Sequence, residues 1–171
     1  MLLDIINIER LRKAIIYLGV MLATLFVQNS ILSQIPILGV KAMFVPIVVV
    51  AVGFFEDGMW GGIFGLLLGL FCDISFGDSP IMFTVLFPII GFFAGCLTMF
   101  FVTRRFWSFF FISLAALALA AFCQMFSLLV ISGTSLWPLL KTGGLQVLWS
   151  IPLTLAVYSP CRKISGLDLS K

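Results

Sequence analysis

The sequence predicts an all-α membrane protein with six transmembrane helices, and its composition is the first reason. Hydrophobic residues make up 62% of the 171 residues, charged residues 10%, and the mean hydropathy is +1.24. This is too little polar surface to cover a water-soluble globular protein. Lipid must therefore solvate the chain. Apolar stretches near the length that crosses about 30 Å of hydrocarbon recur along nearly the whole sequence and leave no room for a soluble domain. The spans are expected over residues 14–32, 42–55, 59–74, 81–102, 106–131 and 144–158.

Turn residues separate the first three spans. Pro36 and Gly39 punctuate the loop after the first span, and the acidic turn Glu56–Gly58 separates the second from the third. The second and third spans are short. At 1.5 Å per residue, the helix between Asp57 and Asp73 is roughly 24 Å long, so these two acids are expected near opposite membrane interfaces.

The last three spans follow the same logic. Ser79 and Pro80 are typical of a helix N-cap and the first helical position, and they should begin the fourth span. Arg104 and Arg105 occupy the fourth loop, and residues 132–143, rich in glycine and hydroxyl side chains, form the fifth. Prolines that should kink helices interrupt the second, fourth and sixth spans, at Pro46, Pro88 and Pro152.

The basic residues predict the orientation of the chain. With the N-terminus inside, eight of the ten basic residues face the cytoplasm, and the outer loops hold only Lys41 and Lys141. We therefore expect a cytoplasmic segment over 1–13 that lies on the inner surface as a short helix, a six-helix domain over 14–159 and a cytoplasmic tail over 160–171. The net charge of +3 suits contact with anionic lipids and gives no hint of nucleic acid.

The chain offers little material for catalysis or metal binding. It has no histidine, and its four cysteines are scattered singly, which argues against a disulfide framework, a metal site or a bound cofactor. Asp73 and Asp78 could suggest an intramembrane aspartyl hydrolase, but they stand five residues apart across one turn, and no nucleophile with a base is nearby. We expect no enzyme activity.

The most informative pattern is a stripe of small residues that ends in an acid. Four positions at four-residue spacing form this glycine stripe: Gly61, Gly65, Gly69 and Asp73. Each step advances about 400° around a helix, so the stripe stays on one face and allows a second helix to pack backbone to backbone. That helix could come from the same chain, where Gly91 and Gly95 are the obvious mate and Gly19 with Ala23 a further candidate, or from a partner or second copy. Asp73 needs a donor from this chain or another.

The segment around the stripe resembles a known family. The run Gly61-Gly62-Ile63-Phe64-Gly65-Leu66-Leu67-Leu68-Gly69-Leu70-Phe71-Cys72-Asp73-Ile74, followed by Gly77 and by Gly91-Phe92-Phe93-Ala94-Gly95, is similar to the rod shape-determining protein MreD family of the bacterial inner membrane. The resemblance implies a non-enzymatic scaffold of the cell-elongation machinery that supports rod shape and lateral peptidoglycan synthesis. It also implies a single-pass partner, MreC, and through it MreB filaments and peptidoglycan synthases. The residues carried over are the stripe with Gly91 and Gly95.

The same resemblance raises an alternative function. The family is similar in architecture to the substrate-binding subunits of energy-coupling-factor vitamin transporters. Such a subunit would need polar groups that converge at the outer side, where the sequence offers only Lys41, Asp78, Lys141 and some hydroxyl groups. The scaffold is therefore the expected function, and a vitamin-binding subunit is the alternative.

Overall fold

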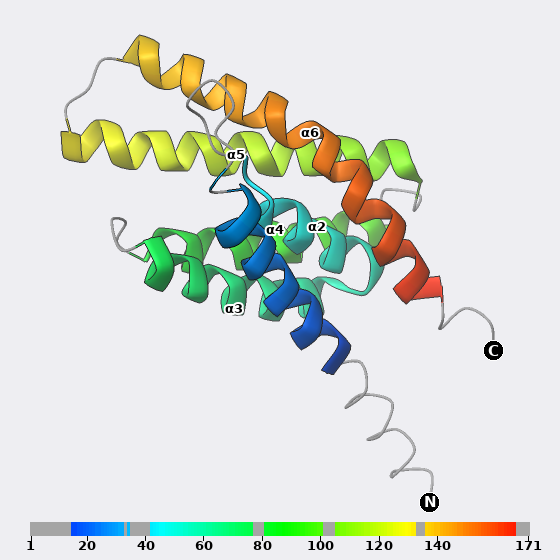
Figure 1. Ribbon diagram of the computed structural model, residues 1–171. Coiled ribbons are helices and arrows are strands. Elements are labelled where there is room, and N and C mark those ends of the chain that lie inside the picture. The colour runs from blue at the N-terminus through cyan, green and yellow to red at the C-terminus, as the bar shows by residue number, and fades with distance from the viewer. Residues whose placement is uncertain are drawn as a thin grey trace, which may run out of the picture.

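In the computed structural model, all regular secondary structure of the described residues is helical (Figure 1). The structure describes residues 15–32, 34, 42–76, 81–100, 105–132 and 136–166. A helix over residues 15–26 continues as a π-helical segment, η1. The labelled elements are η1 (Val27–Leu32), α2 (Val45–Phe55), α3 (Gly58–Phe76), α4 (Met82–Phe100), α5 (Phe106–Ser132) and α6 (Leu136–Gly166).

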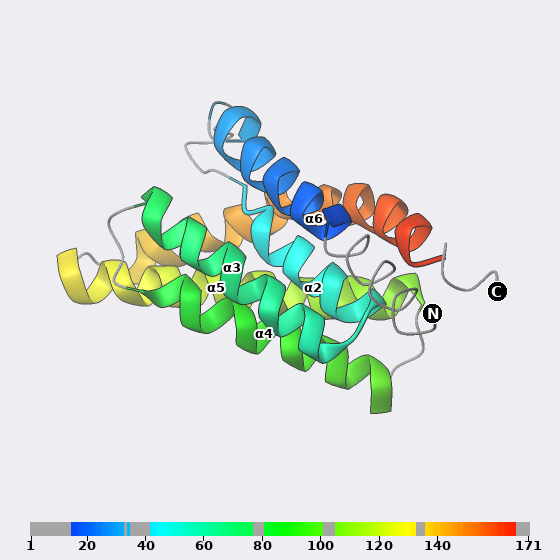
Figure 2. The ribbon, with the colours of Figure 1, turned by 90° about the horizontal axis from the view of Figure 1, so that it is seen from below.

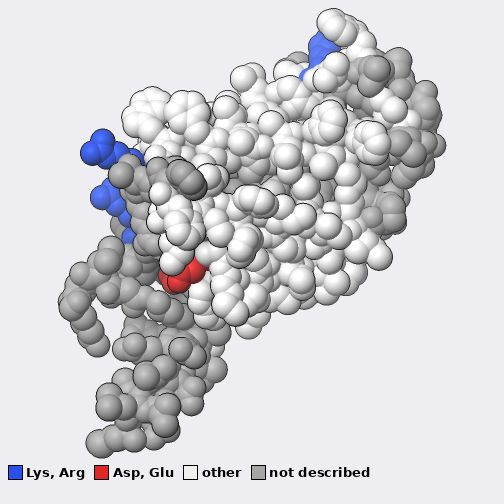
Figure 3. Space-filling view, turned by 180° about the vertical axis from the view of Figure 1, so that it is seen from behind, with Lys and Arg blue, Asp and Glu red and all other residues white. Residues whose placement is uncertain are grey.

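Within the described ranges, three helices are long and apolar enough to cross a membrane, namely α3, α4 and α5. The apolar helix Ile15–Ser30 and α2 are shorter. Figure 3 shows a broad uncharged surface, with Lys and Arg near its two ends and Asp or Glu near one of them. Large apolar side chains such as Phe93 and Phe122 are more than 60% exposed, as expected where lipid replaces water. The predicted all-helical class is confirmed for the described residues, and three helices of this length and composition indicate a membrane protein, while the count of six crossings stays a prediction.

Consecutive helices run in opposite directions in both ribbon views (Figures 1 and 2). As a result, the start of the helix over 15–26, the turn between α2 and α3, the start of α5 and the end of α6 gather at one end of the molecule. Helices α3 and α4 form one closely packed pair and α5 and α6 another, and α2 contacts all four. This arrangement places α2 in the centre of the bundle.

Helix α2 is the core of the fold because all eleven of its residues are buried. A helix that is apolar on every side can only be stable when protein or lipid surrounds it, and here neighbouring helices do so. Pro46 lies in the first turn of α2, where its missing N–H has no helical partner to lose. The expected interruption of the second span at Pro46 is therefore wrong, whereas Pro88 and Pro152 do lie inside α4 and α6.

The boundaries of the other helices lie within two or three residues of the expected ones, except for α6, which begins at Leu136 and ends at Gly166, eight residues beyond the expected span at each end. The expected loop over 132–143 is thus helical from residue 136 onward. Pro138 is the third residue of α6, and proline in the first turn breaks no hydrogen bond. Proline is compatible with a helix start, and Gly143 lies inside α6, where an added Cβ would collide with Met125 of α5. These residues therefore do not require a loop, which is why the sequence misplaced this boundary.

The non-helical residues 42–44 before α2 are held by side chains from two other helices. Gln28 Nε2 donates to the Ala42 carbonyl oxygen at 3.1 Å, and the Phe44 backbone N–H donates to Gln28 Oε1 at 2.8 Å. The Met43 N–H donates to Ser150 Oγ at 2.9 Å. Non-helical backbone within a membrane protein needs such partners because lipid supplies none. These bonds fix the entry of the chain into its buried central helix.

Replacing Gln28 by Leu should lower the free energy of unfolding by about 2 kcal/mol, because the Ala42 carbonyl and the Phe44 N–H both lose their partner at a buried site. Ser150→Ala removes one partner of Met43 and should cost about 1 kcal/mol. Both values can be measured by unfolding in mixed micelles of mild detergent and dodecyl sulfate. If Gln28→Leu costs no more than Ser150→Ala, the two-bond clamp at residues 42–44 does not stabilise the fold as described.

Candidate functional site

The three glycines of the stripe all lie in the contact between α3 and α4. A Cβ added at Gly61 would lie 2.5 Å from the Gly91 carbonyl oxygen, and one added at Gly65 would lie 2.5 Å from that of Phe87. A Cβ at Gly69 would collide with the Phe83 carbonyl. No real Cβ makes such contacts with backbone atoms, so the two helices approach this closely only because the side chains are missing. The stripe is therefore used for packing within the chain.

The mate of the stripe on α4 is built from Gly91 and Gly95. An added Cβ at Gly91 would collide with the Gly61 carbonyl, and one at Gly95 would collide with the backbone of Gly58. The central helix joins this contact, because a Cβ at Gly53 of α2 would also collide with the Gly91 carbonyl. Three helices therefore meet at Gly53, Gly61 and Gly91. Sequence reasoning missed Gly53 and Gly58, since neither continues a four-residue spacing on its own helix.

Other glycines do not share this role. Gly62 follows Gly61 directly, but an added Cβ there would meet its nearest atoms only at 3.8 Å, which is ordinary contact. A Cβ at Gly19 would meet nothing within 4 Å, and both Gly19 and Ala23 are exposed. Gly19 and Ala23, the further candidate pair predicted from the sequence, thus take no part in close packing among the described residues.

Asp73 ends the stripe by capping the next helix. Its Oδ1 accepts a hydrogen bond from the Phe83 N–H at 3.1 Å, and its Oδ2 accepts from the Thr84 N–H at 2.8 Å and from Thr84 Oγ1 at 2.6 Å. These donors lie in the first turn of α4, where backbone N–H groups lack helical partners and the helix dipole favours negative charge. The donor that Asp73 requires therefore comes from its own chain. Ser79 and Pro80, expected to begin this helix, lie outside the described residues.

The Asp73 carboxylate serves as a helix cap in this geometry. Each Asp73 oxygen accepts a hydrogen bond from α4, so the carboxylate is occupied as a cap. In the described ranges, no group of three His, Cys, Asp or Glu side chains gathers to hold a metal ion, and the four cysteines are free and spread over α3, α4, α5 and α6. Asp78, the second acid weighed for catalysis, lies outside those ranges.

The site is thus a hairpin of α3 and α4 that is closed along its length by backbone contact and at one end by a carboxylate cap. It contains all six residues carried over from the family resemblance: Gly61, Gly65, Gly69, Asp73, Gly91 and Gly95. The assignment of this chain to a family stays a prediction. No protein-family model, curated protein or solved structure matches the chain.

Proposed function

We propose that this chain is a non-enzymatic scaffold of the bacterial cell-elongation machinery in the inner membrane, required for rod shape and lateral peptidoglycan synthesis. In this proposal it crosses the membrane six times with both termini in the cytoplasm, in an arrangement similar to that of vitamin-transporter substrate-binding subunits. The basic residues carry the orientation, since Arg105 and Arg162 stand at the helix ends that gather on one side and Lys141 lies near the opposite end of α6.

The observation that carries the proposal is the α3–α4 hairpin. The residues that resemble the MreD family are the ones that bring these two helices into backbone contact, so the resemblance falls on a structural unit. Backbone contact along the hairpin leaves no space for a small molecule between the two helices. A rigid hairpin suits a scaffold that holds other membrane segments in place, and it offers nothing that a carrier of polar ligands needs.

The packing also constrains where a partner can bind. Because α4 already covers the glycine stripe, the single span of an MreC-type partner has to contact an outward face of the bundle. The outward faces present large apolar side chains such as Phe92 on α4, Phe111 on α5 and Leu155 on α6. In the proposal, MreB-type filaments and peptidoglycan synthases are reached through that partner.

Depletion of the protein in its native host should turn rods into round cells within a few generations, because lateral wall synthesis loses its membrane scaffold. Cell width measured by phase-contrast microscopy is the readout. Expression of the wild-type chain, or of Gly62→Ala, should restore the rods, whereas Gly65→Leu should not. Unchanged cell width after verified depletion would remove the wall-synthesis assignment.

A further inference from the structure

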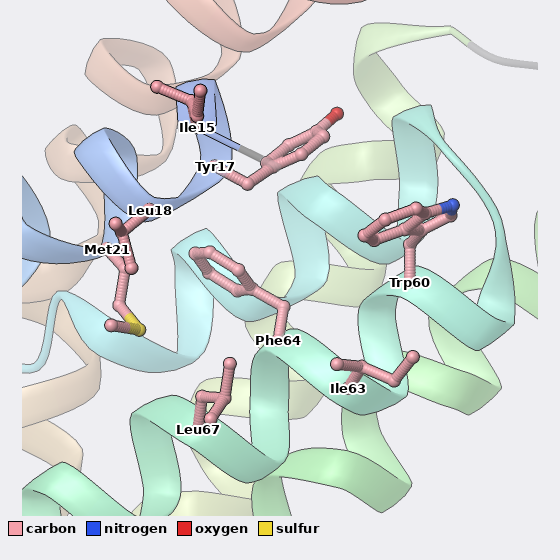
Figure 4. A pocket seen from close by; sticks show the side chains of 8 residues that line it. All are labelled: Ile15, Tyr17, Leu18, Met21, Trp60, Ile63, Phe64 and Leu67. Carbon is pink, nitrogen blue, oxygen red and sulfur yellow. The ribbon is translucent and has the colours of Figure 1, made fainter. Parts of the chain in front are cut away.

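A groove of about 380 Å³ lies between the helix over residues 15–26 and α3 (Figure 4). Its volume is in the range of ligand sites, roughly 300–1,000 Å³. Buried Met21 and Phe64 form part of the lining, at 4% and 5% exposure. The other aliphatic lining residues are each more than a third exposed: Ile15, Leu18, Ile63 and Leu67. The groove is therefore an apolar channel that opens sideways, toward the lipid that surrounds the bundle.

The two ends of the groove differ in chemistry. Tyr17 and Trp60 flank one end with their rings stacked at a centroid distance of 6.2 Å. Trp60 lies in the first turn of α3, so this end is close to the acidic turn between α2 and α3. Tyr and Trp favour the membrane interface, where the ring is in the apolar layer and its polar atom reaches the headgroups. From Trp60 the groove follows α3 to Leu67, about 10 Å along the helix and away from that interface.

The shape of the groove favours a narrow, flexible and apolar ligand. A transmembrane helix with its side chains is about 10 Å across and can only lie over such a groove, not enter it. A single acyl chain enters lengthwise. The only polar atoms of the lining side chains are the Tyr17 hydroxyl and the Trp60 indole nitrogen, both at the interface end, so a polar ligand finds no partners deeper in the groove.

Basic residues in the sequence before the first helix favour an anionic lipid headgroup. Lys13 stands two residues before the groove residue Ile15 in the sequence, and Arg10 and Arg12 precede it. Clusters of Lys and Arg directly before a membrane helix attract anionic lipids, by roughly fivefold in affinity per basic residue near the surface. The acids Glu56 and Asp57 close the α2–α3 turn at the same end and reduce this attraction.

We propose that this groove binds one acyl chain of an anionic phospholipid, whose headgroup lies beside Tyr17 and Trp60. Bound in this way, the lipid fills the space between the first helix and α3 and couples their packing to the composition of one leaflet. The groove uses side chains of α3 other than those of the glycine stripe, and the inference does not rest on the proposed scaffold function.

The fluorescence of Trp60 reports on the groove once Trp107, Trp137 and Trp149 are each replaced by Phe. The purified single-tryptophan protein is reconstituted into phosphatidylcholine vesicles that contain increasing fractions of chain-brominated phosphatidylglycerol. Bromine quenches only tryptophans that it touches. Half-maximal quenching of Trp60 is expected at a mole fraction at least about fivefold lower than with brominated phosphatidylcholine. Equal quenching by the two lipids would overturn the proposal. The absence of quenching by either lipid would also overturn it, because it would mean that protein covers the groove.

Two matched pairs of substitutions test the location. Leu18→Phe with Ile63→Phe fills the groove and should abolish the preference for phosphatidylglycerol. Leu22→Phe with Leu66→Phe makes the same change on the same two helices outside the groove, where Leu22 and Leu66 are similarly exposed, and should keep the preference. If both pairs behave alike, the groove is not the site. Native mass spectrometry of the unaltered chain, released from mixed vesicles, should retain phosphatidylglycerol over phosphatidylcholine and needs no substitution.

Replacement of Arg10, Arg12 and Lys13 by Gln should bring the half-quenching fractions of the two lipids together while quenching itself remains. Persistence of the full preference in that variant would refute the role given to these three charges.

Discussion

Gly65→Ala is expected to lower the free energy of unfolding by about 3 kcal/mol, a large effect for one added methyl group. The new Cβ would lie 2.5 Å from the Phe87 carbonyl oxygen and 2.9 Å from the Pro88 nitrogen. Both are backbone atoms of α4, so they cannot move without the helix. The helices must therefore separate along the hairpin, and the contacts at Gly61 and Gly69 weaken with the one at Gly65. The better helix propensity of alanine offsets only about 1 kcal/mol of this cost.

Gly62→Ala is the matched control for this experiment. It adds the same methyl group to the same helix three residues earlier, but the nearest atoms would be 3.8 Å away. The propensity gain should then dominate, and stability should stay the same or rise by up to about 1 kcal/mol. Helix content followed through dodecyl sulfate titration in mixed micelles measures both variants. Equal stability of the two would show that α3 and α4 do not pack as closely as described.

The same geometry changes how a partner-binding experiment must be interpreted. Gly65→Leu would disrupt the hairpin itself, so the loss of a bound partner in that variant would report misfolding rather than a removed interface. Substitutions on exposed positions of other helices, such as Phe111 or Leu155, leave the hairpin intact and test the interface directly. A partner lost only in those variants would locate the docking face.

Much of the helix layout could be predicted from sequence because turn chemistry is local. The acidic turn at Glu56 and Asp57 and the basic loop before Phe106 both fall at real helix ends. The start of α6 was missed because residues that often form loops are also compatible with a first helical turn. Gln28 was interpreted only as the polar end of a span, since its partners Ala42 and Phe44 are more than a dozen residues away and no local pattern connects them.

The sequence predicted which residues form the candidate site, but not which residues they contact. Spacing determines which residues share a helix face, and the pairing of Gly61 with Gly91 follows that expectation. Spacing does not say what lies opposite, so it could not add Gly53 from α2 or choose between a partner from the same chain and one from another. That choice depends on the path of the chain between α3 and α4, which places Thr84 beside Asp73.

Asp73→Ala should destabilise the protein by about 3 kcal/mol, because it removes the acceptor of three hydrogen bonds at once. The Phe83 and Thr84 N–H groups would then lack a partner at the start of a membrane helix, and the favourable charge at the positive end of that helix would be lost. Asp73→Asn keeps one acceptor oxygen and replaces the other by a donor, so about half of this loss is expected. Ser75→Ala, at an exposed position two residues along α3, is the matched control and should be neutral.

A double-mutant cycle separates the cap from any indirect effect of Asp73. Thr84→Val alone removes one hydroxyl hydrogen bond to the carboxylate and should cost about 1 kcal/mol. In the Asp73→Ala background the hydroxyl has already lost this acceptor, so the same change should cost almost nothing, and the difference is the coupling between the two side chains. Additive losses would mean that the Thr84 hydroxyl is not bound to Asp73 and that the carboxylate acts through other groups, such as a donor from a second chain. The carboxylate would then again be available as a contact for a partner, despite its position at the end of the hairpin.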